Sequence, residues 1–260
     1  MRMRKLKVLE LFSGTRSIGK AFESSGHDVY SVDWNADFEA SWHTDIGGIR
    51  AKDVIARFGH PDVVWASPDC TTFSVAAISK HRKHDEVLGG GIAISPYAQK
   101  CDQTDLNVVR LLRDLRPTLY FIENPRGMLR KMPWMQWSPM YTVCYCQYLT
   151  KLPIEQRRMK PTDIWTNHPN PNFLPPCKNG DPCHVRAPRG SVTGTQGLKL
   201  IDKYRIPEDL CAHIVSISED YIKRVDMANG WLSAYGFEPI TPQWDDGPYE
   251  PIQLSMDITS

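Results

Sequence analysis

The amino-acid sequence predicts one α/β domain built on a doubly wound, mostly parallel β-sheet. Apolar runs of strand length occur at residues 6–11, 28–32, 62–66 and 118–122, and segments with helical periodicity separate them. Strands that alternate with helices form parallel sheets, and ligands of such sheets bind beyond the carboxyl ends of the strands. A chain of 260 residues, of which 41% are hydrophobic, can bury the core of such a domain.

Each predicted helix has a recognisable beginning or end. A turn at Ser13-Gly14 precedes the first helix, which ends near Gly26. The second helix covers residues 49–58, and a Gly-His-Pro sequence ends it. The third covers residues 105–115, where leucine and valine recur at helical spacing, and it ends before Pro117.

The rest of the chain is less regular. Residues 75–102 are expected to form a loop, and residues 141–148 and 163–165 further strands. Residues 166–200 are rich in Pro, Gly, Asn and Thr and are too long for an ordinary connection, which indicates a functional insert. A last helix is expected to begin at Pro207 and to stop at Asn229-Gly230.

Amino-acid composition argues against some classes of protein and favours one kind of partner. No apolar run approaches the roughly 20 residues that span a membrane, and the seven scattered cysteines argue against a disulfide framework, so we expect a cytoplasmic protein. The net charge is only +1, but basic residues cluster at positions 80–84, 126–131, 157–160 and 186–189. One such cluster is usually a solvated face, whereas four in loops and in the insert favour a nucleic-acid partner.

Two motifs follow predicted strands in the first quarter of the chain. In Glu10-Leu11-Phe12-Ser13-Gly14 the glycine permits a close backbone approach to a ligand, and Asp33 at the end of the next strand suits two ribose hydroxyls. Cys70 lies in Pro68-Asp69-Cys70-Thr71, directly after a buried strand, where α/β enzymes place their chemistry. For the glycine motif the ordinary alternative is a simple connection between a strand and a helix. For Cys70 it is a small buried side chain without a chemical role.

Two further motifs carry charge. Glu123-Asn124-Pro125 again follows a buried strand, and a carboxylate there is costly to bury unless it is paired or protonated, which makes Glu123 a candidate acid. An N-terminal helix cap is the ordinary alternative. In Gln156-Arg157-Arg158-Met159-Lys160, strand-like alternation would place Arg158 and Lys160 on one face.

In this order and spacing, the four motifs resemble the cytosine-5 DNA methyltransferase family, in a phage- or prokaryote-like form with a short target-recognition insert. The resemblance covers about residues 5–166. It implies a Rossmann-like methyltransferase fold, S-adenosylmethionine as cofactor and DNA as partner, for a chain acting as a monomer. The domains expected are a catalytic and cofactor domain (1–165), the insert (166–202), a returning helix (203–230) and a tail (231–260).

The resemblance also implies site residues. The catalytic residues are Cys70, Glu123 and Arg158. The cofactor-binding residues are Phe12, Ser13, Gly14, Thr15, Arg16, Ser17, Asp33, Trp34, Asp45, Ile46, Pro68 and Arg205. The substrate-binding residues are Ser74, Asn124, Pro125, Gln156 and Lys160.

The implied chemistry explains these residue types. Cytosine C5 becomes nucleophilic when the Cys70 thiolate adds at C6, Glu123 protonates N3, and Arg158 holds the base carbonyl. The base must leave the duplex to be reached. Two other functions stay open, an RNA cytosine-5 methyltransferase and a nucleic-acid-binding relative without catalysis.

The sequence departs from the family pattern at three places. Asp69 stands where the nucleophile loop usually has proline, and Arg16 and Ser17 stand where glycines are common. Lys203 to Pro207 replaces a Gly-Asn-x-Val-Pro segment. The added cations Arg16, Lys203 and Arg205 indicate either repacking with an ion pair to the methionine carboxylate, or a carboxylated S-adenosylmethionine as cofactor.

The insert contains a candidate zinc site. Cys177, Cys183 and His184 lie close in sequence, and a tight turn through residues 179–182 would bring the two cysteines together. Cys146 is the expected fourth ligand, with Cys144 as the alternative. Ordinary loop packing is the competing interpretation, although a small insert without a core would gain stability from a metal.

Overall fold

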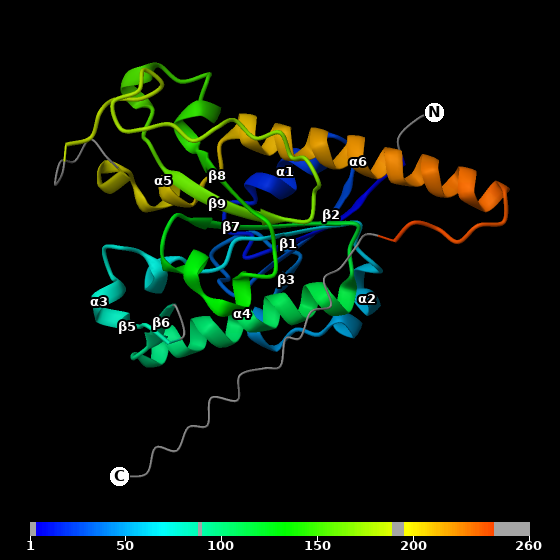
Figure 1. Ribbon diagram of the computed structural model, residues 1–260, viewed down its shortest axis with the longest axis horizontal. Coiled ribbons are helices and arrows are strands. Elements are labelled where there is room, and N and C mark those ends of the chain that lie inside the picture. The colour runs from blue at the N-terminus through cyan, green and yellow to red at the C-terminus, as the bar shows by residue number, and fades with distance from the viewer. Residues whose placement is uncertain (1–3, 88–89, 189–194, 242–260) are drawn as a thin grey trace, which may run out of the picture.

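The computed structural model describes residues 4–87, 90–188 and 195–241 and is organised around one seven-stranded sheet (Figure 1). Along the sheet the strands are β3 (Trp42–His43), β2 (Asp28–Asp33), β1 (Lys7–Leu11), β4 (Val63–Ala66), β7 (Leu119–Pro125), β9 (Pro161–Thr166) and β8 (Met140–Cys144). β9 runs antiparallel to both neighbours, and the other pairings are parallel. The predicted fold class, a mostly parallel Rossmann-like methyltransferase sheet, is confirmed.

Helices cover both faces of the sheet. α1 (Ser17–Ser24) and α6 (Glu208–Ala234) pack on one face, and α2 (Ala51–Phe58) and α4 (Pro96–Leu115) on the other (Figure 1). The strand period of two divides the core accordingly: Val8 faces α1 and α6, while Leu9 joins the cluster under α2 and α4. The carboxyl ends of β1, β2, β4 and β7 therefore share one edge of the sheet.

The region before α4 is more ordered than expected. Residues 75–102, predicted to be a loop, contain α3 (Ile78–His81), a hairpin of β5 (Arg82–Asp85) and β6 (Gly90–Ala93), and the first turns of α4. α4 begins at Pro96 rather than at residue 105. Ser95 caps it by accepting a hydrogen bond from the Ala98 N–H, and proline occupies the first turn, where its missing N–H costs nothing.

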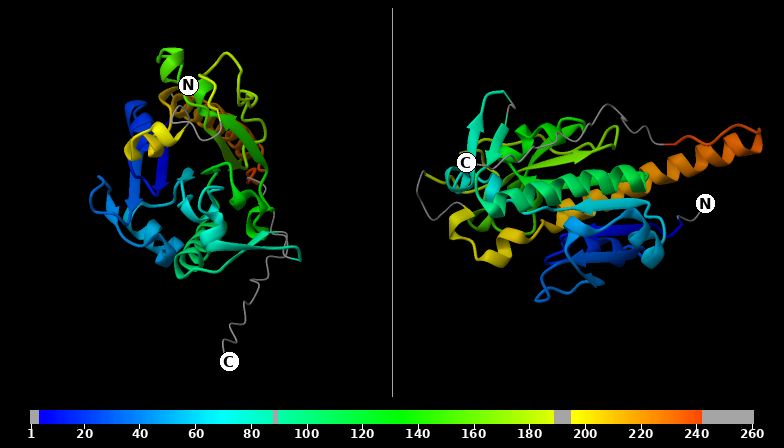
Figure 2. Two further views of the ribbon diagram at one scale, coloured as in Figure 1. Left: turned by 90° about the vertical axis from the view of Figure 1, so that its left-hand side faces the viewer. Right: turned by 90° about the horizontal axis from the view of Figure 1, so that it is seen from below.

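The C-terminal third differs from expectation at element ends. β8 stops at Cys144 and continues as a 3-10 turn, not as a strand to residue 148. After α5 (Leu200–Tyr204), α6 runs through Asn229-Gly230 and ends at Ala234, because an exposed glycine costs a helix only about 1 kcal/mol. The far end of α6 projects beyond the sheet (Figure 2). Residues 242–260 of the predicted tail lie outside the described residues.

Short 3-10 turns complete the described secondary structure. They are η1 (Ile46–Gly48), η2 (Thr71–Phe73), η3 (Met128–Lys131), η4 (Pro133–Met135), η5 (Tyr145–Tyr148), η6 (Ile154–Gln156) and η7 (Thr195–Gly197). No helix within the described ranges combines the length and the apolar character needed to cross a membrane.

Candidate active site

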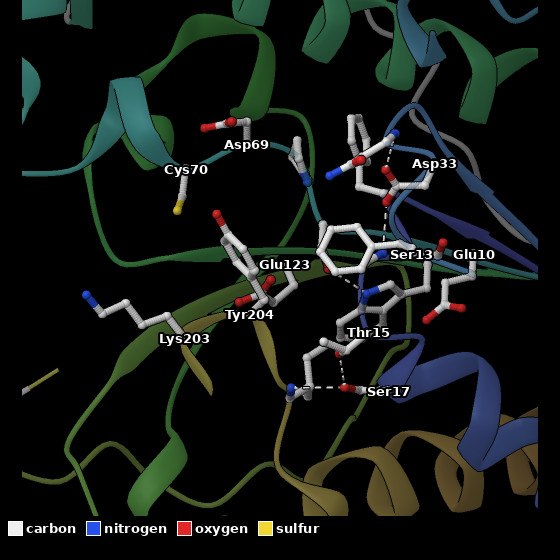
Figure 3. Close-up of a pocket in the computed structure, with 18 of the residues that line it drawn as sticks. Glu10, Ser13, Thr15, Ser17, Asp33, Asp69, Cys70, Glu123, Lys203 and Tyr204 are labelled. Atoms are coloured by element: carbon white, nitrogen blue, oxygen red, sulfur yellow. Dashed lines mark hydrogen bonds between the residues drawn. The ribbon is translucent and has the colours of Figure 1, made fainter. Parts of the chain in front are cut away.

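A cavity of about 440 Å³ opens at the carboxyl-end edge of the sheet (Figure 3). That volume lies within the 300–1,000 Å³ typical of ligand pockets. The residues named from sequence that line it are Phe12, Ser13, Gly14, Thr15, Ser17, Asp33, Trp34, Pro68, Cys70, Glu123, Pro125 and Lys160. Those that do not line it are Arg16, Asp45, Ile46, Ser74, Asn124, Gln156, Arg158 and Arg205.

The loop after β1 forms one wall of this cavity. Phe12, Gly14 and Arg16 adopt left-handed backbone conformations, with φ values of 57°, 46° and 56°. Asp33 at the end of β2 fixes the loop, since its carboxylate accepts from the Gly14 N–H at 2.8 Å and from the Asn35 N–H at 2.9 Å. The glycine motif and the acid named from sequence are thus joined directly.

The segment before α6 closes the cavity from the other side. The Ile206 N–H donates to Ser17 Oγ at 3.3 Å, and Lys160 Nζ donates to the Lys203 carbonyl at 2.7 Å. Lys203 and Tyr204 line the cavity together with the loop after β1 (Figure 3). The segment from Lys203 to Ile206, just before α6, therefore contributes to the wall of this pocket.

Glu10 lines the same cavity, and the sequence reasoning left it out of the site. Its side chain is buried. One carboxylate oxygen accepts from the Gly19 N–H at 3.0 Å, and the other has no hydrogen-bond partner among the described residues. Burial raises the pKa of Glu10 to about 7, although the Gly19 hydrogen bond opposes the shift. An acidic residue among the apolar residues Val8, Leu9 and Leu11 was the available signal.

This buried carboxyl predicts a pH-dependent stability. The ordinary pKa of glutamate, near 4.5, applies to the unfolded chain, so the folded protein retains the Glu10 proton up to about pH 7. Its contribution is fully present below the unfolded pKa and is lost as the pH rises through the folded value. We expect the melting temperature of Glu10→Gln to decline less than that of the unmodified protein as the pH rises from about 4.5 to about 7, the interval between the unfolded and the folded pKa of Glu10. Parallel declines in thermal scans would contradict this assignment.

Cys70 follows β4 and precedes η2, and its thiol points into the cavity (Figure 3). Burial raises its pKa to about 11, the charges of Glu123 and Asp69 add to the shift, and Lys160 opposes it. The two carboxylate oxygens of Asp69 accept hydrogen bonds from the Tyr97 hydroxyl and from the Thr71 N–H, the latter at 2.6 Å. The Asp69 carboxylate, which also lines the cavity, thus has hydrogen-bond partners of its own.

Glu123 faces the cavity from β7. Its carboxyl is buried, and its Oε1 accepts from the Tyr145 hydroxyl at 2.8 Å. The neighbouring Asn124 points the other way, and its amide donates to the Pro68 carbonyl at 2.9 Å. Asn124 therefore ties β7 to the loop that carries Cys70 and does not line the cavity.

A buried arginine supports the same loop and was missed from sequence. Arg82 donates to the Thr72 carbonyl at 3.0 Å and to the Thr72 hydroxyl at 2.8 Å, and it forms an ion pair with Asp102 at 2.7 Å. Its guanidinium also lies over the Phe73 ring. In the sequence Arg82 belongs to a basic cluster, and residues of such clusters are usually solvated. Its supporting role becomes visible only in the structure, where Arg82 begins β5 of the hairpin.

The segment between η6 and β9 lines a second cavity of about 640 Å³. Gln156, Arg158 and Lys160 all line it, and Lys160 lines the Cys70 cavity as well. The Arg158 guanidinium donates to the Glu155 carbonyl at 2.6 Å. In this structure Lys160, rather than Arg158, lines the Cys70 cavity.

The remaining residues named from sequence have other partners. Asp45 caps η1 and forms an ion pair with Lys100, and Ile46 is buried in the core. Ser74 accepts a hydrogen bond from the Ala76 N–H. Of the three added cations, Lys203 lines the Cys70 cavity.

The other two added cations line a neighbouring cavity. Arg16 is held there by Glu23 and Glu39. Arg205 is 63% exposed in its side chain and lies 3.5 Å from Asp202.

Comparison with known proteins finds similarity to a protein named as a methyltransferase. No protein-family model matches the sequence. A protein of Frog virus 3 (isolate Goorha), named "Probable DNA (cytosine-5)-methyltransferase", is 25% identical over 236 residues, which cover 82% of this chain and 100% of that protein.

Solved methyltransferases are also similar. Entamoeba histolytica EhMeth is 17% identical, with a TM-score of 0.42 over 72% of this chain and 58% of its own, and S. pombe Dnmt2 is 18% identical, with a TM-score of 0.39 over 62% and 50%. The chain thus spans about half the length of these solved structures. The resemblance that the motifs indicate is confirmed: the chain is similar, over 82% of its length, to a protein named as a probable DNA (cytosine-5)-methyltransferase.

Proposed function

We propose that this protein methylates carbon 5 of cytosine in DNA, with S-adenosylmethionine as methyl donor and Cys70 as covalent nucleophile. One observation carries the proposal: Cys70 and Glu123, at the ends of neighbouring parallel strands, line the same cavity as the glycine turn after β1. A thiol, a carboxyl and a cofactor-type loop around one cavity are the parts that this reaction needs.

Different residues of the cavity carry out different steps of the proposed reaction. The Cys70 thiolate adds to C6 of the cytosine while Glu123 passes a proton to N3, which leaves C5 electron-rich. C5 then takes the methyl group and loses its own proton to water. The electrons of that C–H bond re-form the ring double bond and break the bond between C6 and sulfur, which releases the thiolate, and N3 returns its proton to Glu123. Lys160 supports the thiolate, because its charge lowers the pKa of Cys70 against the larger effect of burial.

The other wall of the cavity fits an adenosine-bearing cofactor. Gly14 brings the backbone close to the pocket, the Asp33 carboxylate stands at the end of β2, and the Trp34 side chain is 71% exposed beside it. An exposed indole offers a stacking surface for a purine. When bound, S-adenosylmethionine supplies a methyl group on a positively charged sulfur, and that charge would further favour the Cys70 thiolate.

A nucleic acid is the proposed substrate, and DNA is favoured over RNA because the Frog virus 3 relative is named for DNA. Cys70 is half-buried and lines the cavity, so a base stacked within a duplex does not reach it. Methyltransferases solve this problem by flipping the target base into the pocket. In the basic segments at residues 80–84 and 126–131, Arg82 and Arg130 form ion pairs with Asp102 and Asp163. The exposed cations of these segments, Lys80, Lys83, Arg126 and Lys131, suit contacts with phosphate.

The product identifies the reaction. Purified protein is incubated with S-adenosylmethionine and either duplex DNA or transfer RNA, and the digested nucleosides are analysed by mass spectrometry. We expect 5-methylcytosine in the DNA arm. Product in the RNA arm alone would transfer the function to RNA, and no modified cytosine in either arm would favour a binding protein without catalysis.

The same analysis separates the two cofactor candidates. With carboxylated S-adenosylmethionine supplied in addition, 5-carboxymethylcytosine is the product if Lys203 holds the extra carboxylate. Exclusive 5-methylcytosine would assign Lys203 to closing the cavity through its carbonyl bond with Lys160.

A further inference from the structure

Four side chains with metal-binding atoms converge at the insert, away from the Cys70 cavity. Cys146, Cys177, Cys183 and His184 each offer one such atom, and these atoms all lie within 4.8 Å of one another. Cys146 Sγ lies 3.4 Å from Cys177 Sγ and 3.7 Å from Cys183 Sγ. His184 Nδ1 lies 3.3 Å from Cys183 Sγ and 3.9 Å from Cys177 Sγ.

These separations match the edges of a metal-centred tetrahedron. With Zn–S near 2.3 Å and Zn–N near 2.0–2.1 Å, tetrahedral geometry places ligand atoms about 3.5–3.8 Å apart. A disulfide would need sulfurs about 2.05 Å apart and would leave the other thiol and the imidazole without a role. Three thiolates and one imidazole are a donor set that structural zinc prefers over magnesium or calcium.

The chain is shaped to bring these ligands together. A turn joins Lys178 and Asp181 by two hydrogen bonds, of 2.7 and 3.0 Å, and Gly180 takes the positive φ of 108° that it requires. The turn returns Cys183 and His184 to Cys177. Cys146 comes from η5, a segment far away in sequence, so the cluster ties the insert to the end of β8.

Cys144 is the neighbouring thiol that stands apart. Its side chain points to the Cys177 carbonyl at 3.8 Å, and it does not belong to the four-residue group. The choice between Cys144 and Cys146 as fourth ligand is thereby decided by geometry in favour of Cys146.

We propose that these four residues bind one zinc ion, and that the ion holds η5 in the position from which Tyr145 contacts Glu123. Tyr145 directly precedes the ligand Cys146, and its hydroxyl is 2.8 Å from the Glu123 carboxyl. The metal site stands on its own geometry, whereas its effect on catalysis rests on the proposed function of Glu123. An insert with little regular structure, such as residues 166–188, gains its order from such a metal.

Metal analysis of the full-length protein, purified without chelators, tests the site without reference to activity. We expect about one zinc per chain, with X-ray absorption showing three sulfur ligands and one nitrogen ligand. Cys183→Ser and His184→Ala should lose the metal, Cys144→Ser should keep it, and His184→Cys should retain it through a fourth thiolate. Absence of zinc from the unmodified protein, or retention of zinc by both Cys183→Ser and His184→Ala, would overturn the proposal.

Hydrogen exchange tests the link to Glu123. Removing the metal with a chelator should increase exchange of the amides of η5 and the insert while β1 and β4, in the sheet core, stay protected. Unchanged exchange in η5 after complete metal removal would overturn the positioning role. If metal and exchange behave as expected and no methylated product forms, the zinc site stands and the proposed function fails.

Discussion

Replacing Cys70 by alanine is expected to abolish methyl transfer while leaving the fold and cofactor binding nearly intact. The thiol lines the cavity, and no hydrogen bond from its sulfur supports neighbouring elements in the described structure, so its loss costs little stability. Without the sulfur no bond forms at C6, and C5 stays a poor nucleophile. Steady-state transfer and cofactor affinity, measured on the same preparation, separate the two effects.

A matched variant controls for the loss of a thiol. Cys101 is buried in α4 near the nucleophile loop and does not line the cavity, so Cys101→Ala should retain transfer. A DNA substrate containing 5-fluorocytosine should trap the unmodified protein covalently, because fluorine at C5 blocks the elimination that releases the thiolate. Trapping should fail in Cys70→Ala. Full turnover by Cys70→Ala would remove the covalent mechanism altogether.

The parts of the site that follow strands could be predicted from sequence, because strand ends are set by local pattern. Gly14, Asp33, Cys70 and Glu123 all lie directly after apolar runs, and the parallel sheet brings them to one edge. Cys177, Cys183 and His184 of the proposed metal site could be predicted for a similar reason, since a turn signal lies between Cys177 and Cys183.

The direction in which a side chain points could not be predicted from the sequence in the same way. Asp45 and Arg158 occupy the expected positions in the motif order, yet Asp45 pairs with Lys100 and Arg158 binds a backbone carbonyl. Arg82 was assigned to a basic cluster that favours nucleic acid, and it is buried beneath the nucleophile loop. The reason is that β5 and β6 pair as antiparallel strands, which the pattern of four residues does not reveal. Such partners depend on tertiary packing.

Glu123→Gln is expected to slow methyl transfer by about 10²–10⁴-fold, the usual contribution of a positioned general acid. Glutamine has nearly the same shape and can still accept the Tyr145 hydrogen bond, so the fold of β7 should persist. It cannot pass a proton to N3 of the cytosine, and this loss accounts for the decrease. Glu86→Gln, at an exposed position in the hairpin region, provides the matched control and should leave the rate unchanged.

The same substitution should make Cys70 more reactive in the absence of substrate. The Glu123 charge is one cause of the raised pKa of Cys70, about 11, so a neutral side chain lowers that pKa and increases the thiolate fraction at any pH below it. Alkylation of Cys70 by iodoacetamide, followed by peptide mass spectrometry from pH 7 to 10, should therefore be faster in Glu123→Gln, while methyl transfer is slower. A merely structural carboxyl would change both rates in the same direction, and an unchanged transfer rate would leave Glu123 without a part in the chemistry.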